Sequence, residues 1–150
     1  MRDDITIDNA ASQDFIPVMR ELVRAYQAFA SYDAAAYRDT DLTVAQADVI
    51  FTLGNTRGLT FKEIGELTLI TKGTLTGVID RLEQKALVKR ITQADDRRCT
   101  RVVLTARGQT LFTKAFPRQI AYIKQRFDRL SPQDMKQLHS MLKKLRMAFE

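Results

Sequence analysis

Side chains that could carry out acid–base, nucleophilic or metal chemistry are few in this sequence of 150 residues. His139 is the one histidine and Cys99 the one cysteine; neither stands at metal-ligand spacing from the other, and His139 is expected on a helix surface. Asp95 and Asp96 are adjacent, so in an extended hairpin their carboxylates face opposite ways and cannot form an acid–base pair. No glycine-rich phosphate loop is present. We therefore expect no catalytic residue, no metal site and no cofactor.

A different chemistry, recognition of nucleic acid, is favoured by the segment 71–84. Helical periodicity places four apolar residues on one stripe, namely Leu75, Val78, Ile79 and Leu82. The rest of the surface carries two glycines one turn apart among hydroxyl and basic residues: Lys72, Gly73, Thr74, Thr76, Gly77 and Arg81. Each glycine inside a helix costs about 1 kcal/mol relative to alanine, so the pair needs a reason.

Close approach to DNA is one such reason. A helix in the major groove gains room where side chains are absent, and neighbouring threonines and arginine can contact bases and phosphates. A solvated face that tolerates two glycines is the alternative. Asp80 on this face would repel phosphate unless it accepts a hydrogen bond from cytosine or is neutralised by an arginine, and the sequence leaves both open.

Two β-branched runs, 88–92 and 100–104, predict a β-hairpin whose tip, residues 93–99, is basic. Helix, turn, helix and hairpin is the order of a winged helix. In that fold the hairpin can place arginine in a minor groove while the second helix occupies the major groove. We therefore expect Arg97 and Arg98 to contact DNA.

Helix-start patterns surround this motif. A capping box at residues 60–63 begins a helix that carries Ile64 and Leu67 inward, and Thr71 caps the second helix of the motif. Another box at residues 43–46 begins an earlier helix that extends to about residue 53.

Long amphipathic helices are expected on both sides of the motif. One spans residues 12–37 with Pro17 in its first turn, another follows Thr105 with a kink at Pro117, and the last runs over residues 132–149 after an N-cap serine. These helices carry too many apolar residues to be exposed to solvent, so we expect them to form a layer that packs against a second, identical subunit. A monomeric helical cap is the alternative.

From Leu42 to about Leu111 the residues resemble the MarR family of bacterial transcription regulators. The residues that carry the resemblance are Leu42, Thr43, Gln46, Leu59, Thr60, Ile64, Leu67, Thr76, Asp80, Arg81, Leu82, Glu83, Leu87, Val88, Arg90, Asp96, Arg97, Arg98, Leu104, Thr105, Ala106, Arg107 and Gly108. The sequence departs from the family at Ala86, where glycine is common, and this departure indicates a different helix C-cap.

The resemblance implies a mainly helical protein with a two-stranded β wing. Residues 1–150 would form one unit with a winged helix-turn-helix lobe at 42–105 and a helical dimerisation layer at 12–37 and 106–149. The function implied is that of a sequence-specific DNA-binding regulator, with repression the favoured mode, that binds a palindromic operator as a homodimer. The family pattern also implies that Asp96 holds Arg98 in the wing.

Many family members bind aromatic or hydrophobic effectors, so the resemblance implies a small-molecule site. Aromatic residues recur along the first long helix at Tyr26, Phe29, Tyr32 and Tyr37. They would form an apolar wall with a few hydroxyls. The alternative is that they pack in the core.

The net charge of +6 and pI of about 9.7 favour a polyanionic partner. Residues 1–70 hold 6 basic and 11 acidic groups (−5), residues 71–107 hold 9 and 4 (+5), and residues 108–150 hold 9 and 3 (+6). The middle value supports DNA binding by the motif, and the last fits solvated faces of helices. No membrane span or signal peptide is predicted, and we expect a cytoplasmic protein. The alternative functions are a winged-helix module that binds protein without DNA, and an enzyme or carrier.

Overall fold

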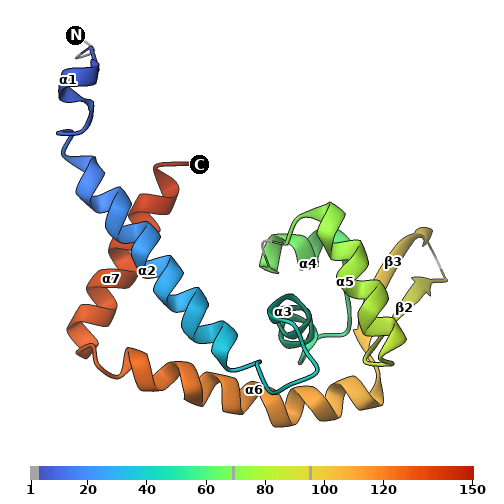
Figure 1. Ribbon diagram of the computed structural model, residues 1–150. Coiled ribbons are helices and arrows are strands. Elements are labelled where there is room, and N and C mark those ends of the chain that lie inside the picture. Colours follow the sequence, from blue (N-terminus) through green and yellow to red (C-terminus); the bar gives the residue numbers. More distant parts are fainter. Residues whose placement is uncertain (1–3, 69, 95) are drawn as a thin grey trace. The chain divides into compact units, whose positions relative to one another are not determined.

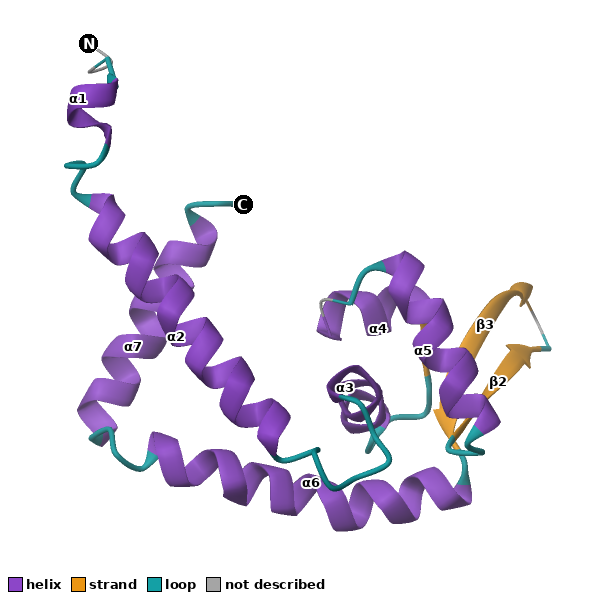
Figure 2. Ribbon diagram, viewed as in Figure 1, coloured by secondary structure: helices purple, strands orange, loops and turns teal. Residues whose placement is uncertain are grey.

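The computed structural model of the chain describes residues 4–68, 70–94 and 96–150, which are mainly helical with one small antiparallel sheet (Figure 2). This confirms the predicted fold class. The chain divides into two compact units, Met1–Asp39 and Thr40–Glu150. Within the described ranges, no helix is long and apolar enough to span a membrane.

The N-terminal unit contains two helices, α1 (Ile7–Ala10) and α2 (Phe15–Ala35). The predicted helix over 12–37 is therefore too long at both ends, and Tyr37 lies in the turn after it. Pro17 lies in the first turn, as predicted. The short helix α1 was not predicted, because four residues held by a capping box between Thr6 and Asn9 give no periodic pattern.

The second unit contains the winged helix-turn-helix and two further helices (Figure 1). Its elements are α3 (Val44–Leu53), β1 (Leu59–Thr60), α4 (Phe61–Thr68), α5 (Lys72–Gln84), β2 (Val88–Gln93), β3 (Asp96–Leu104), α6 (Ala106–Phe127) and α7 (Pro132–Met147). Most predicted caps are confirmed. Thr43 and Ser131 each form a capping box, and the Thr105 hydroxyl accepts the Gly108 N–H at 3.0 Å. Helix α6 continues through Pro117, and α7 ends two residues before the predicted Phe149.

The sheet has the order β1-β3-β2, with both pairs antiparallel. The strand β1 was not predicted; it pairs Leu59 with Val102 and joins the start of α4 to the wing. The predicted hairpin tip over 93–99 is too long, because β3 begins at Asp96. Backbone pairing with β2 extends the strand through residues whose polar side chains gave no strand pattern, with an irregularity between Thr92 and Gln93.

The core of this unit lies between α3, α4, α5 and the sheet. Its largest fully buried side chains include Ile50, Ile64, Ile79 and Val102. The prediction that Leu67 points inward is wrong, because that side chain is 65% exposed. At 100° per residue, Phe61 and Ile64 set the buried side of α4 and turn Leu67 about 90° away from it.

Helix α5 ends in a tight left-handed turn at Ala86, whose φ is +56°. The Ala86 N–H bonds to the Glu83 carbonyl at 2.8 Å, and the Leu87 N–H bonds to the Leu82 carbonyl at 3.0 Å. This is the Schellman cap that usually contains glycine, so the prediction of a different C-cap at Ala86 is wrong. The chain forms the same cap with alanine, at a conformational cost of about 1–2 kcal/mol.

Candidate nucleic-acid interface

Helix α5 has one covered face and one open face, as predicted. Its apolar stripe is buried, with Ile79 and Leu82 fully inaccessible. The residues of α5 predicted to contact DNA are exposed: Lys72, Gly73, Thr74, Thr76, Gly77 and Arg81. The helix is therefore fixed to the core by one side and presents small, hydroxyl and basic groups on the other.

The two helical glycines on the open face are not required by packing. A Cβ atom added at Gly73 or Gly77 would meet nothing within 4 Å, and neither residue has a positive φ. The contrast with Gly108 is clear, because a Cβ there would lie 2.0 Å from the Leu87 carbonyl oxygen. Gly108 is needed to let α6 pass the main chain of Leu87, just before β2, whereas nothing in the chain requires glycine at Gly73 or Gly77.

The start of α5 is held by backbone bonds rather than by a side-chain cap. The N–H groups of Thr74 and Leu75 bond to the Thr71 carbonyl at 3.0 and 2.9 Å. Thr71 occupies the N-cap position as predicted, but its side chain accepts no amide and its hydroxyl instead donates to that of Thr74 at 3.1 Å. The N-terminus of α5, which is the positive end of the helix dipole, is exposed at Thr71 and Lys72. This end of the helix suits a phosphate group.

Asp80 on the open face is neutralised by an arginine of the wing. The Arg90 Nη2 atom of β2 lies 2.6 Å from Asp80 Oδ1, and Nη1 bonds to a carboxylate oxygen of Glu83. The Arg90 main-chain N–H donates to the same carboxylate at 3.2 Å, and its guanidinium lies 5.4 Å from the centroid of the Phe61 ring. Of the two alternatives for Asp80, the structure contains the pairing with arginine.

This Arg90 contact is the site feature that the sequence interpretation missed. Asp80 and Glu83 are three residues apart, so the two carboxylates lie on one side of α5. Their spacing could have indicated a shared cation. Its source could not be known, because Arg90 reaches them only after the turn at Ala86.

A second wing arginine, Arg101 of β3, is occupied inside the lobe. Its Nη1 atom donates to the Gly58 carbonyl at 3.0 Å and lies 3.6 Å from Glu63 Oε2. The predicted box at the start of α4 is confirmed, because Glu63 accepts the Thr60 N–H at 2.7 Å. The pKa of Glu63 is lowered mainly by the hydrogen bonds from Thr60; desolvation opposes this shift, and the charge of Arg101 adds a still smaller lowering.

For the residues predicted to contact DNA from the wing tip, the structure describes the backbone. Asp96, Arg97 and Arg98 lie in β3, at its first three positions, and their side chains lie outside the part of the chain that is described. The pairing of Asp96 with Arg98 therefore stays a prediction. Cys99 follows as a half-buried free thiol.

The aromatic residues predicted for an effector site differ in their solvent exposure. Tyr26 is 69% and Phe29 45% exposed on α2, while Tyr32 and Tyr37 are half-buried. The alternative prediction was that these aromatic residues pack in the core of the chain. It is wrong for the residues on α2, because no residue of that helix is buried. His139 is exposed on α7. Among residues 4–68, 70–94 and 96–150, no three His, Cys, Asp or Glu side chains are grouped to hold a metal ion.

A helix-turn-helix with an open polar face on its second helix, followed by a β wing, defines a winged-helix DNA-binding protein. The sequence profile of the MarR family matches residues 40–98. The winged-helix lobe is therefore that of a MarR-family DNA-binding transcription regulator.

Named relatives agree with this assignment. The regulator MhqR of Bacillus subtilis is 34% identical over 84 residues, which cover 56% of this chain and 58% of MhqR. BpsR of Bordetella bronchiseptica, whose DNA binding is regulated by 6-hydroxynicotinic acid, is 29% identical with a TM-score of 0.75, and the match covers 86% of this chain and 98% of BpsR. MepR of S. aureus, solved as a DNA complex, shares the fold at 20% identity with a TM-score of 0.74, covering 92% and 99%.

Proposed function

We propose that the protein is a cytoplasmic repressor that binds a palindromic operator as a homodimer. Helix α5 of each subunit would enter a major groove, and Arg97 or Arg98 of each wing would reach the adjacent minor groove. The observation that carries the proposal is the open face of α5, where Gly73 and Gly77 have neither a packing nor a backbone reason to be glycine. DNA supplies the missing neighbour.

The homodimer is supported by apolar surface outside the lobe. No residue of α2 or α7 is buried, although both helices carry large apolar side chains. Met19 and Val23 of α2 are 47% and 48% exposed, and Met141 and Leu142 of α7 are 61% and 45% exposed. Apolar surface that recurs along whole helices is typical of a protein interface. A two-fold dimer also explains why the operator should be a palindrome, with half-sites about 34–36 Å apart.

The test is a gel shift with the DNA upstream of the protein's own gene at several salt concentrations. Gly77→Leu should weaken specific binding because the new side chain stands between helix and groove, while the local helix gains up to about 1 kcal/mol. Arg98→Ala should lower affinity and reduce the salt dependence by up to about one counterion. Arg118→Ala on α6 is the matched control and should change neither.

Two results would overturn the proposal. If Gly77→Leu stabilises the protein and operator affinity is unchanged, the open face of α5 does not enter the groove. If the parent protein binds no DNA at any salt concentration, the winged helix would serve as a protein-binding module instead.

We further propose that an aromatic acid releases the protein from DNA by binding beside Tyr26, Phe29, Tyr32 and Tyr37. The support is the regulation of the relative BpsR by 6-hydroxynicotinic acid and the accessible rings of Tyr26 and Phe29. An effector must bind the DNA-incompetent state more tightly, and a tenfold loss of DNA affinity needs about 1.4 kcal/mol of such preference. Calorimetry and operator release with salicylate-like acids should detect binding that Tyr26→Ala weakens. No binding at millimolar concentration to either protein would contradict the effector site.

A further inference from the structure

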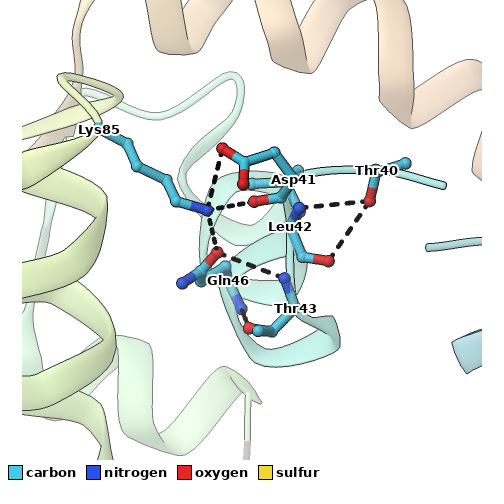
Figure 3. Close-up of polar contacts among 6 residues, drawn as sticks. All are labelled: Thr40, Asp41, Leu42, Thr43, Gln46 and Lys85. Carbon is cyan, nitrogen blue, oxygen red and sulfur yellow. Dashed lines mark hydrogen bonds and ion pairs between the residues drawn. The ribbon is translucent and has the colours of Figure 1, made fainter. Parts of the chain in front are cut away.

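Lys85, the residue that caps the C-terminus of α5, connects this helix to the segment that leads into α3 (Figure 3). Its Nζ atom donates to the main-chain carbonyl of Asp41, lies 3.4 Å from the Asp41 carboxylate, and donates to Gln46 Oε1 at 3.1 Å. An ammonium group has three donor hydrogens; two of them serve the Asp41 carbonyl and the Gln46 amide oxygen, and the Asp41 carboxylate forms an ion pair with the same group. Lys85 thus contacts Asp41, 44 positions earlier in the chain, and Gln46, 39 positions earlier.

The acceptors are themselves held in place. Gln46 is 4% exposed, and its Oε1 also accepts the Thr43 N–H at 3.3 Å in the capping box of α3. The Leu42 N–H donates to the Thr40 hydroxyl at 3.3 Å, which orders the turn before that box. The Asp41 side chain is 95% exposed, so its ion pair contributes little, and the carbonyl and the buried amide are the acceptors that fix Lys85.

The position of this network in the chain gives it a consequence. Thr40 is the first residue of the second compact unit, so the polypeptide enters the lobe through the residues that Lys85 holds. At the other end, the Lys85 N–H bonds to the Arg81 carbonyl at 3.0 Å, and Ala86 then turns the chain into β2. One side chain thus ties the entry segment 40–43 to the end of the DNA-reading helix.

A direct contact between Lys85 and DNA is a weaker explanation. The side chain is 28% exposed, and a lysine that binds phosphate must give up acceptors to do so. The Asp41 carbonyl would then lose the Lys85 donor, and the buried Gln46 oxygen would keep only the Thr43 N–H, which is unfavourable.

We propose that Lys85 is a positioning residue that holds the entry segment 40–43 against the end of α5, so that the two α5 helices of a dimer meet consecutive major grooves together. This inference rests on the proposed homodimer. Binding of the second lobe to one operator is an intramolecular step, and its effective concentration falls when the direction of that lobe is less defined. Loss of Lys85 should therefore affect a full palindrome more than a single half-site.

The experiment compares Lys85→Met with the parent on a full palindromic operator and on a duplex with one half-site. We expect affinity for the full site to fall about tenfold and affinity for the half-site to change by less than about twofold. Lys114→Met, which removes the same charge from an exposed position on α6, is the control and should change both by less than about twofold. Lys85→Gln is a second variant in case Lys85→Met does not fold.

A spectroscopic measurement separates positioning from general damage. Spin labels at Thr76→Cys, in a Cys99→Ser background, report the distance between the two α5 helices of the DNA-free dimer. Lys85→Met should broaden this distance distribution, whereas Lys114→Met should not. Equal loss of affinity on both duplexes, or an unchanged distribution, would overturn the inference. A parent protein that neither dimerises nor binds the palindrome would instead overturn the proposed function, and the inference with it.

Discussion

Helix α5, which we propose reads DNA, and the outer helices α2 and α7 differ in what covers their apolar residues. The apolar stripe of α5 is buried by its own chain, against α3, α4 and the sheet. In α2 and α7 no residue is buried, although both are amphipathic and carry exposed Met, Leu, Val and Phe side chains. One chain is therefore sufficient to complete the lobe, whereas the outer helices lack a cover that we assign to a second copy.

The largest expected effect is on the outer helices. Met141→Asp on α7 places a charge in the proposed interface twice, once per subunit, and should weaken the dimer by about 3–6 kcal/mol. Leu67→Asp is the matched control, because Leu67 of α4 is similarly exposed, at 65% against 61% for Met141, and belongs to the lobe. Sedimentation velocity should show monomer for the first variant and dimer for the second. If both variants are dimers, the exposed apolar residues of α7 are not part of the dimer interface and the proposed difference between α7 and the lobe is contradicted.

Substitution of isoleucine in the two regions gives the next effect. Ile79 of α5 is fully buried and Ile120 of α6 is 49% exposed. In the monomeric Met141→Asp background, Ile79→Ala should lower the free energy of unfolding by about 2–5 kcal/mol through loss of packing and a residual cavity. Ile120→Ala in the same background should lower it by less than about 1 kcal/mol. Urea unfolding measures both, and equal losses would mean that α6 is covered within one chain.

A smaller effect is expected at the contact that carries the wing against α5. Arg90→Met leaves the carboxylates of Asp80 and Glu83 without their cation near DNA phosphates, and should lower operator affinity by about tenfold, or 1.4 kcal/mol. The double variant with Asp80→Asn should recover part of this loss, because the repelling charge is gone. Fluorescence anisotropy with labelled operator gives the four affinities. Additive losses would show that Arg90 does not act through Asp80.

The smallest effect concerns acid. Hydrogen bonds from Thr60 lower the pKa of Glu63 in the lobe, and hydrogen bonds from Ser131 lower the pKa of Asp134 at the start of α7. A carboxyl whose pKa is lower in the folded state adds stability above its unfolded pKa, and this is lost as pH falls through the folded value. The ordinary values are 4.5 for Glu63 and 3.8 for Asp134, so the losses should begin near those pH values.

Substitutions separate the two acidic groups by region. Glu63→Gln should make the unfolding of the monomeric background less dependent on pH below about 4.5, because the titrating cap is absent. Asp134→Asn should alter the pH dependence of the dimer instead. Unfolding curves at pH 3 to 7 test this, and an unchanged acid response in Glu63→Gln would contradict the assigned cause.

Features that depend on neighbouring residues were predictable from the sequence. The capping boxes at residues 43–46 and 60–63 and the stripe on α5 use spacings of three and four, and the structure contains them. The exposed glycines of α5 follow from the same stripe, because a buried side fixes the opposite side. These features gave the positions of the motif helices and of the proposed DNA-reading residues.

Features that depend on distant residues were not predictable. The strand β1 is two residues long and exists because β3 pairs with it. Arg90 meets Asp80 only because Ala86 adopts a left-handed turn, and Lys85 meets Gln46 across 39 positions. Leu67 is exposed because the core covers the side of α4 that Phe61 and Ile64 share, and only the packed fold defines that side.

Sedimentation equilibrium of the parent protein, alone and with an operator duplex found by gel shift, tests the central claim most directly. The chain has a mass of 17.1 kDa, so a homodimer should sediment as one species of twice that mass at micromolar concentration. With DNA, two chains should bind each palindromic duplex. A 17.1 kDa monomer that binds the full operator with one chain per duplex would contradict the claim that the outer helices of this regulator are completed by a second copy.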